Sequence, residues 1–551
     1  IKANTMKTKV LIKCIMFIFT TGSFQLLNAQ LPAAEYQPGI AILTGDIRNF
    51  QPEQNLDIRF ASSNLIMGRS EPTFVQPDST GHFRQVVQLK YTTQIRVKIG
   101  EDYLFLLMSP DGQEYHLGIE ANEKGHNMPV TISGPYEAIN NDFNFRLKRL
   151  STNMFVPGTC DLTPDQYKEI CLQDLQKTNT ENNNIRDINP DAKRLMELTN
   201  AFDCVDNLTK CKYAMVYSRM QQDSLQRLVA FGLYKDFRLP DDYFNFLKEM
   251  PLNEPDALLC YNFSSIIPFP GDYQTYQDED EFNKYILVNA PMSQEEKELI
   301  TDYIKNKYTS DNYPHANEVM AISMKYRNIY QKKLKTDLAE LKQRLPLLTG
   351  QEHPMIMELA DIRFARFQFM DYKPLTSEQE AYYKQSLTNP LCIALLDDTN
   401  ESMKPKKKAE PKAGFILHEN PDCPADQVLD AIIDKNRGKI QLIDMWATWC
   451  VGCRQTIKEY EPLKKEFPNV AFVYLTNETS PLELWKKLIP DITGEHYRLD
   501  TKQWGYLWNR FKLQGVPYYL VIDAKGNIVD QFIYTNKKEV QKKLESCNKN
   551  R

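Results

Sequence analysis

Two cysteines separated by two residues lie near the end of this chain, shortly after an apolar run that predicts a buried strand. The run is Ile440–Met445, and the cysteines are Cys450 and Cys453. A helix is expected to begin at Cys450, where unpaired N–H groups and the positive end of the helix dipole favour negative charge. This position lowers the pKa of a thiol, and the thiolate is the form that attacks a disulfide. We therefore predict a redox-active disulfide in which Cys450 is the nucleophile and Cys453 the resolving thiol.

Such a pair can also be half of a zinc site or a static structural disulfide. A zinc site would need a second pair of ligands, whereas His496 and Cys547 stand isolated in the sequence. The spacing at the start of a helix favours a redox pair over a static link. The sequence therefore predicts neither a metal nor a cofactor.

The region around this pair, residues 415–551, alternates apolar strands with helices. Val470–Leu475 and Tyr518–Ile522 predict buried strands, and Cys450–Phe467 predicts a helix that precedes them. The turn Asp523–Asn527 predicts a hairpin after the second of these strands. Buried strands separated by helices imply a central sheet that is covered on both faces, so we expect an α/β fold.

Short motifs in this region occur together, namely Asp444-Met445-Trp446-Ala447-Thr448-Trp449-Cys450, Cys453-Arg454, Gly515-Val516-Pro517-Tyr518 and Asp523-Ala524-Lys525-Gly526. In this combination they resemble thioredoxin-like proteins, and most closely the exported TlpA/ResA-type thiol–disulfide oxidoreductases. The resemblance implies a thioredoxin-like fold over residues 415–551. The order of a β-rich start, a helical middle and a thioredoxin-like end is also similar to multidomain members of that family.

The resemblance assigns Asp444 to the position of a buried acid on the strand before Cys450. A carboxyl group there has a raised pKa and takes the proton from Cys453 as that thiol becomes the second attacking group. The alternative is a strand residue whose carboxylate hydrogen-bonds nearby backbone. As the proton acceptor, Asp444 would complete the catalytic set with Cys450 and Cys453.

The resemblance also places Val516 and Pro517 in a loop that faces the cysteines and contains a cis proline. This loop would offer backbone groups to an extended substrate and keep metal ions away. The alternative is an ordinary trans proline at the start of a strand. Trp449 is expected to shield the disulfide and contact substrate, whereas Trp446 is expected to pack in the core.

Val451 and Gly452 stand between the cysteines, where many relatives have a proline. The intervening residues tune the reduction potential, so the resemblance does not fix the direction of the reaction. We expect a reductase of disulfides in exported proteins, supplied with electrons by a thiol donor in the membrane. The alternatives are a thiol oxidase, a disulfide isomerase, or a partner-binding scaffold in which the redox domain is secondary. A peroxidase is disfavoured because Ala447 stands where such enzymes usually have threonine or serine.

The first residues have the order of a secretory signal peptide, with a basic start, an apolar run and a small residue at the end. Met6 is the expected true start, Lys7 follows it, the run is Val10–Phe19, and Ala29 closes residues 1–29. The run is shorter than the about 20 apolar residues of a membrane span. We therefore expect export to the periplasm; the alternative is an uncleaved segment that retains the protein at the inner membrane.

Residues 31–140 show the alternation of half-buried strands. Leu56, Ile58 and Phe60 alternate with charged residues, and the turn-forming run Pro110-Asp111-Gly112 separates two such stretches. We predict a small antiparallel β-sandwich.

Residues 141–400 change to the helical period, which predicts an α-helical domain. Thr163 and Ser293 each begin a capping box, and apolar residues recur at three- and four-residue steps from Val319 to Leu341. These steps predict one long helix that ends near Pro346. Its tyrosine-rich stripe is interpreted as a core face, with a binding groove as the alternative.

Residues 401–414 are charged, contain proline and lack aromatic residues, so they are predicted to be a linker. The whole chain has 551 residues, which is too long for one ordinary core. Its net charge of −5 provides no basic excess to neutralise phosphates, which argues against nucleic-acid binding.

Eleven cysteines are present, and some outside the redox pair are close enough in sequence to form disulfides. Cys160 could pair with Cys171, and Cys204 with Cys211, but sequence does not decide connectivity. Most of these cysteines are expected to be buried, inert thiols.

Overall fold

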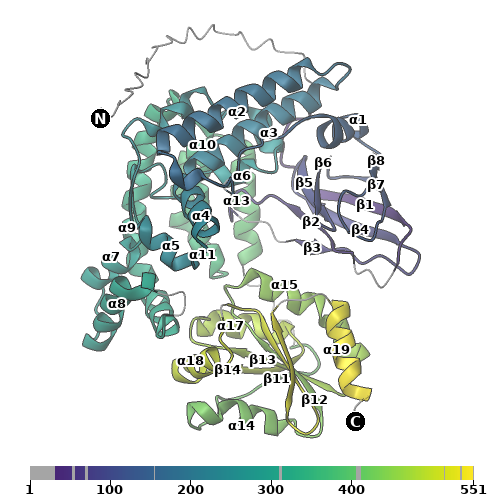
Figure 1. Ribbon diagram of the computed structural model, residues 1–551, viewed down its shortest axis with the longest axis vertical. Helices are drawn as coiled ribbons and strands as arrows, with labels where there is room; N and C mark the ends of the chain where they lie inside the picture. Colours follow the sequence, from purple (N-terminus) through teal and green to yellow (C-terminus); the bar gives the residue numbers. More distant parts are fainter. Residues whose placement is uncertain are drawn as a thin grey trace, which may run out of the picture.

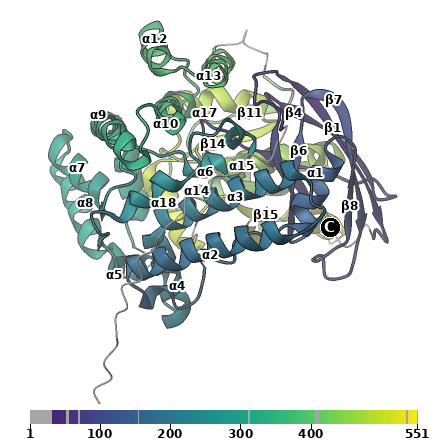
Figure 2. The same cartoon turned by 90° about the horizontal axis from the view of Figure 1, so that it is seen from above.

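The computed structural model describes residues 31–51, 56–68, 72–153, 155–309, 313–404, 411–513, 515–533 and 537–549. The segment interpreted as a signal peptide and residues 405–410 of the predicted linker lie outside the described residues. The N-terminal strands lie beside a large group of helices, and the C-terminal α/β region lies below both, with α15 on the side that faces them (Figure 1). Seen from above, the first two groups lie over the third (Figure 2).

The N-terminal strands form two four-stranded sheets, with orders β4-β1-β7-β8 and β3-β2-β5-β6. The strands are β1 (Gly39–Arg48), β2 (Ile58–Ser62), β3 (Thr73–Phe74), β4 (His82–Leu89), β5 (Thr93–Ile99), β6 (Asp102–Met108), β7 (Asp111–Glu120) and β8 (Val130–Ser133). The buried faces of both sheets share one hydrophobic cluster, to which Leu43 and Leu117 contribute from one sheet and Phe60 and Val97 from the other.

The expectation of a wholly antiparallel arrangement is wrong for one pair of strands. β1 runs parallel to β7, with Leu43 opposite Tyr115 and Arg48 opposite Glu120. The chain leaves β1, passes through both sheets and returns beside β1 in the same direction. Alternation of apolar and polar residues marks a strand but is the same for both directions of pairing, so the sequence could not reveal this.

The helical region contains α1 (Glu137–Asn141), α2 (Pro164–Asn184), α3 (Pro190–Thr209), α4 (Cys211–Asp223), α5 (Arg227–Leu233), α6 (Phe263–Ile266), α7 (Glu281–Asn289), α8 (Gln294–Asn306), α9 (Ala316–Thr349), α10 (Met355–Phe364), α11 (Arg366–Met370), α12 (Ser377–Ser386) and α13 (Pro390–Met403). A short antiparallel pair, β9 (Asp236–Arg238) and β10 (Tyr276–Asp278), interrupts them. Both capping boxes expected from the sequence are present: Thr163 and Ser293 accept backbone hydrogen bonds at 3.2 Å, at the starts of α2 and α8.

The long helix ends near Pro346 as expected, but the proline does not end it, because α9 continues through this residue to Thr349. Leu345 and Thr349 are both buried, and the Thr349 hydroxyl donates to the Leu345 carbonyl at 2.8 Å. Burial of this last turn offsets the cost of a proline inside a helix, about 3 kcal/mol. The helix ends at Gly350, whose φ of 70° lies in the left-handed region that glycine adopts readily.

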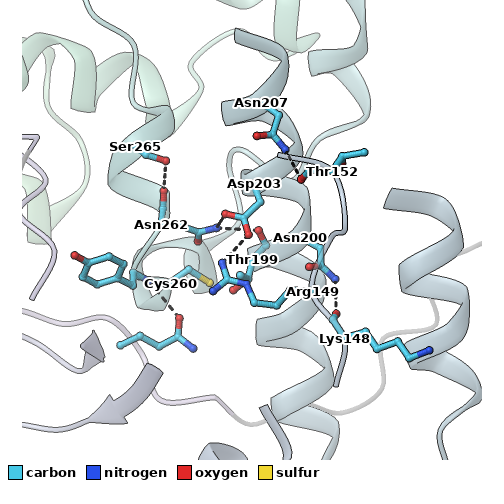
Figure 3. Close-up of polar contacts among 12 residues, drawn as sticks. Lys148, Arg149, Thr152, Thr199, Asn200, Asp203, Asn207, Cys260, Asn262 and Ser265 are labelled. Atoms are coloured by element: carbon cyan, nitrogen blue, oxygen red, sulfur yellow. Dashed lines mark hydrogen bonds and ion pairs between the residues drawn. The ribbon is translucent and has the colours of Figure 1, made fainter. Parts of the chain in front are cut away.

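A cluster of polar side chains fixes α3 to the two segments beside it (Figure 3). Asp203 on α3 pairs with Arg149 at 2.6 Å and accepts a hydrogen bond from Asn262 at 2.7 Å. The residue before Asn262, Tyr261, donates its backbone N–H to the side chain of Gln94 on β5 at 3.2 Å. These bonds join the sheets to the helices.

The eight described cysteines outside the redox pair are free thiols, so neither Cys160–Cys171 nor Cys204–Cys211 is a disulfide. Six of them are buried. Burial raises the pKa of Cys171 to about 11 and that of Cys260 to about 12, so both remain protonated near neutral pH. These observations agree with the expectation of buried, inert thiols.

The C-terminal region has a six-stranded sheet in the order β11-β14-β13-β12-β15-β16. Its elements are β11 (Phe415–Leu417), α14 (Val428–Lys435), β12 (Ile440–Met445), α15 (Val451–Glu459), α16 (Glu461–Glu466), β13 (Val470–Thr476), α17 (Leu482–Leu488), β14 (Gly494–Arg498), α18 (Thr501–Arg510), β15 (Tyr518–Ile522), β16 (Ile528–Ile533) and α19 (Lys537–Lys549). Strands β11 to β14 pair in parallel, whereas β15 is antiparallel to both of its neighbours.

Every residue of the central strand β12 is buried, because helices cover both faces of the sheet. Leu442 packs with α15 and α19 on one face, and Ile443 packs with α14 and α18 on the other. The single helix expected over Cys450–Phe467 is instead two helices. The helix is interrupted at Tyr460, which ends α15 and precedes α16, and Pro462 lies in the first turn of α16. In the part of the chain that the structure describes, no helix is both long and apolar enough to cross a membrane.

Candidate active site

The two cysteines lie at the carboxyl end of the central strand, where α15 begins. Cys450 is the residue that caps the N-terminus of α15, and its Sγ accepts the backbone N–H of Cys453 at 3.0 Å. The two side chains form a disulfide, with Cα atoms 5.3 Å apart. Cys450 is 8% exposed and Cys453 is fully buried. Only Cys450 therefore has a surface that another protein's sulfur can approach.

The loop before Cys450 is held by residues that follow the neighbouring strand β13. The backbone N–H of Thr448 donates to the hydroxyl of Ser480 at 3.0 Å, and the indole N–H of Trp449 donates to the hydroxyl of Thr479 at 3.0 Å. The ring of Trp449 stays 36% exposed beside the disulfide, whereas Trp446 is fully buried. Sequence reasoning missed Thr479 and Ser480, although parallel strands bring their carboxyl ends together at one edge of a sheet.

The loop before β15 faces the cysteines from the other side. The peptide bond between Val516 and Pro517 is cis. The carbonyl oxygen of Val516 lies 3.5 Å from Sγ of Cys450. The structure therefore brings Val516, Pro517, Trp449 and the cysteine pair together around one point.

Asp444 lies inside the sheet, and its neighbours on β13 and β15 are Tyr474 and Tyr519. The side chain is buried, and its Oδ1 has no hydrogen-bond partner. Burial raises the pKa of this carboxyl group well above its ordinary value, although the charge of Lys464 and the neighbouring hydroxyl group of Tyr519 act in the opposite direction. A raised pKa makes this carboxylate a stronger proton acceptor than that of an exposed aspartate.

Lys464 on α16 is the cation that acts on Asp444, and no motif in the sequence points to it. Burial lowers the pKa of Lys464, while the carboxylate of Glu461 at 2.6 Å raises it. The ammonium group lies 5.2 Å from the centre of the Tyr474 ring. Because α16 is a separate helix, the position of Lys464 relative to β12 depends on the interruption between the two helices at Tyr460. It does not follow from the number of residues between Lys464 and the cysteines.

A chain of hydroxyl groups links the surroundings of Asp444 to Cys453. The hydroxyl of Tyr519 donates to Thr456 Oγ1 at 2.7 Å, and Thr456 Oγ1 donates to the carbonyl oxygen of Cys453 at 2.9 Å. Thr456 and Tyr519 are both buried. These bonds fix the turn of α15 that carries the inner cysteine.

The residues considered as zinc ligands are not grouped. His496 is buried, one ring nitrogen lies 2.9 Å from the carbonyl oxygen of Ile492, and burial lowers its pKa to about 4. Among the described residues, no group of three or more His, Cys, Asp or Glu side chains is arranged to hold a metal ion.

The helical region contacts the active-site helix through Tyr372, which follows α11. The Tyr372 hydroxyl accepts a hydrogen bond from Arg454, the residue after Cys453, and its carbonyl oxygen accepts one from Lys487 on α17 at 2.7 Å. Both cations lie 5.8 Å from the centre of its ring. Tyr372 has a φ of 53°, a left-handed backbone that is uncommon for a residue other than glycine.

The sheet order, the helix start and the disulfide define the C-terminal region as a thioredoxin-like domain, and residues 438–528 match a family model described as thioredoxin-like. Among known proteins, the region is similar to the thioredoxin-like protein YneN of Bacillus subtilis, with 32% identity over 115 residues that cover 20% of this chain and 65% of that protein. It is also similar to the thiol:disulfide interchange protein DsbE of Pseudomonas fluorescens, with 32% identity over 98 residues that cover 18% of this chain and 53% of that protein.

The chain thus spans less than two thirds of the length of these curated relatives. A thiol:disulfide interchange protein of Chlorobium tepidum is a similar solved structure, with 20% identity and a TM-score of 0.19 over 21% of this chain and 83% of that one. These matches concern the C-terminal region alone.

Proposed function

We propose that the protein is an exported thiol–disulfide oxidoreductase of the TlpA/ResA type, which reduces disulfides in other exported proteins. The observation that carries the proposal is the arrangement of one accessible and one buried cysteine, Cys450 and Cys453, at the start of a helix in a thioredoxin-like domain. The helix dipole and the N–H group of Cys453 both stabilise a thiolate on Cys450.

In the proposed reaction, the thiolate of Cys450 attacks one sulfur of a client disulfide. The client S–S bond breaks, a bond forms between Cys450 and the client, and the other client sulfur leaves as a thiolate that takes up a proton. Cys453 then gives its proton to Asp444 and attacks Sγ of Cys450. The bond between Cys450 and the client breaks, the client sulfur leaves as a thiolate that takes up a proton, and the Cys450–Cys453 disulfide forms, so the client has gained two electrons and two protons. A membrane-bound dithiol donor returns two electrons to the pair.

The surrounding residues have supporting roles in this proposal. The Val516–Pro517 loop lies against Cys450 and would pair its backbone with an extended client segment while excluding metal ions. Trp449, which is 36% exposed, would cover one side of the disulfide and offer its ring to the client.

Export is part of the proposal and depends on residues 1–29, which we interpret as a signal peptide that directs the chain to the periplasm. An uncleaved segment would instead hold it at the inner membrane. Fractionation of cells together with sequencing of the mature N-terminus would separate the two. We further propose that residues 31–140, 141–400 and 415–551 are distinct domains, with residues 401–414 as a linker.

Trapping tests the proposed mechanism. A Cys453→Ser variant lacks the resolving thiol, so it should accumulate mixed disulfides between Cys450 and clients in an extract of exported proteins. The Cys450→Ser variant is the matched control and should trap none. If the Cys453→Ser variant captures no protein and exchanges with no small disulfide, the oxidoreductase function is wrong.

The direction of the reaction is tested by the reduction potential of the pair. A value near about −270 mV would support a reductase, whereas a value near about −120 mV would support an oxidase. Refolding of a scrambled disulfide protein would reveal an isomerase. Equilibration with glutathione buffers, followed by alkylation of the free thiols, gives the potential.

A further inference from the structure

A cleft of about 770 Å³ lies between the helical region and the thioredoxin-like domain. Its helical wall includes Met324 and Tyr330 on α9 and Phe367 and Met370 on α11. Its other wall includes Trp449 and Leu484. In Figure 1 the ends of α11 and α13 point down toward α15 and α17, which is the side of the domain that carries these residues.

The cleft reaches residues on both sides of the cysteine pair in the sequence. Thr448 and Trp449, which line it, directly precede Cys450, and Arg454, which also lines it, directly follows Cys453. A chain lying in the cleft would therefore contact residues that flank the cysteine pair, although neither cysteine itself lines the cleft. The volume lies within the range of ordinary ligand pockets, about 300–1,000 Å³.

The lining is apolar and adaptable. Methionines come from four separate places in the chain, namely Met67, Met324, Met370 and Met403. Methionine side chains are flexible and polarisable, so a surface built from them accepts apolar side chains of different shapes. This composition suits a site that binds many different sequences, provided that they are apolar.

The charges that line the cleft are mostly positive. Lys90, Arg327, Arg366 and Arg454 contribute four cations, and Asp371 contributes the one carboxylate among the lining residues that the structure describes. Arg327 pairs with Asp371 and Lys90 pairs with Asp398, and Arg366 lies 4.1 Å from the centre of the Phe269 ring. An occupant with negative charge would be attracted into such a site.

We propose that this cleft binds an extended segment of the client polypeptide, with apolar side chains and net negative charge next to the client's disulfide. The inference rests on the proposed function and names its substrate class. The helical region would hold the segment while Cys450 attacks the neighbouring disulfide, so selection of clients would come from residues far from the cysteines in sequence. Burial of the client's apolar side chains would supply the affinity, and the cations of the cleft would supply the preference for segments with negative charge.

Synthetic peptides test the inference with the full-length reduced protein. Each peptide carries one intramolecular disulfide beside a test segment; the segment is apolar with glutamates, apolar with lysines, or polar with glutamates. The rate of oxidation is followed by Trp449 fluorescence in a stopped-flow instrument. Each rate is divided by the rate of the same protein with hydroxyethyl disulfide, a small neutral substrate that does not need the cleft.

The apolar peptide with glutamates should react about tenfold faster than each of the other two, the factor that about 1.4 kcal/mol of binding free energy produces. Met370→Glu places a negative charge on a residue that is 36% exposed, and it should remove this preference. Leu347→Glu is the matched control, because Leu347 lies on α9, is 73% exposed and does not line the cleft. It should keep the preference.

Equal relative rates for the three peptides, or an unchanged preference in Met370→Glu, would overturn the cleft as the client site. Either result with normal exchange of hydroxyethyl disulfide would leave the proposed oxidoreductase function intact. Absence of exchange with hydroxyethyl disulfide itself would instead count against that function. The two failures are therefore distinguishable.

Discussion

Asp444 has a tyrosine beside it on each neighbouring strand and a lysine from a separate helix nearby. Its carboxyl group is isolated from water, which keeps the protonated form stable at a pH where an exposed aspartate is charged. The buried hydroxyls of Tyr519 and Thr456 connect the same surroundings to the turn of Cys453. The domain thus combines one accessible thiol, one buried thiol and one buried acid, Asp444.

Replacing Asp444 by Asn removes the proposed proton acceptor. The step in which Cys453 resolves the mixed disulfide should slow by about a hundredfold near neutral pH, the size of an ordinary general-base contribution. The loss should shrink at high pH, where Cys453 ionises without help. Rapid-quench measurement of mixed-disulfide decay against pH checks this, and an unchanged pH profile would assign Asp444 a structural role.

The same substitution should stabilise the fold. Because the folded-state pKa of Asp444 is raised, the folded protein binds more protons than the unfolded chain, and stability falls as pH rises toward that pKa. An asparagine side chain is never charged, so Asp444→Asn should unfold at a higher temperature than the parent at neutral pH, with the difference closing in acid. Calorimetry across pH measures it.

Site residues that lie close together in the sequence could be predicted. Site residues that only the folded structure brings together could not. Cys450, Cys453 and Asp444 lie on one strand–helix unit, where spacing predicts the cysteine pair and the family resemblance assigns Asp444. Lys464 and Tyr372 reach the site through a helix break and from another part of the chain, and neither has a motif. The roles of the predicted residues stay proposals until the variants are measured.

At the scale of elements, α15 carries the cysteines at one end and Glu459 at the other. Burial raises the pKa of Glu459 to about 7, and the charge of Asp57, from the N-terminal β region, also raises it. Glu459 Oε1 accepts the backbone N–H of Lys537 at 3.1 Å, while its other oxygen has no partner. The far end of the active-site helix therefore holds a group that changes charge near neutral pH.

Glu459 should make stability depend on pH. Its folded-state pKa exceeds the ordinary 4.5, so the folded state binds more protons between about pH 4.5 and 7, and stability falls as pH rises through this window. Glu459→Gln should flatten that decline and raise the melting temperature at pH 8 by roughly 2–4 °C. The exposed Glu483→Gln is the control and should leave the decline as it is.

The proline inside α9 gives a second prediction for an element. Pro346 lacks the N–H group that an interior helical residue donates, so Pro346→Ala should stabilise the helical region by about 1–3 kcal/mol. Pro390 lies at the first position of α13, where proline is well tolerated, and Pro390→Ala should bring no such gain. Chemical denaturation followed by circular dichroism compares the two, and equal effects would contradict the argument.

The types of most elements followed from hydrophobic period and capping, but their ends and directions did not. The capping boxes at Thr163 and Ser293 and the buried strand Ile440–Met445 depend on neighbouring residues alone. The parallel pairing of β1 with β7 and the passage of α9 through Pro346 depend on long-range packing. The tyrosine stripe of α9 divides in the same way: Tyr326 is buried in the core, whereas Tyr330 lines the cleft.

At the scale of the whole molecule, Tyr372 joins the helical region to the two helices that flank the active site. Replacing it by Asn keeps a residue that accepts a left-handed backbone but removes the ring and the hydroxyl. The two cation–ring contacts are worth about 0.5–1 kcal/mol each, so amide exchange in the first turn of α15 should quicken by roughly fivefold or more.

Hydrogen-exchange mass spectrometry measures this loosening, and Tyr382→Asn is the control because Tyr382 is 59% exposed on α12. Exchange in α15 that is equally fast in both variants would show that Tyr372 does not hold the two regions together. Unchanged exchange in Tyr372→Asn would show the same.

The buried thiols of the helical region also matter for a molecule that carries a reactive disulfide of its own. Cys171, Cys204, Cys211, Cys260 and Cys392 are closed off from solvent and carry raised pKa values, so they are poor nucleophiles. Under oxidising conditions a chain with many accessible thiols would exchange with its own active site and become locked in wrong pairings. Here folding buries these five thiols, so under the proposed function a native molecule would react with foreign disulfides without exchanging with them.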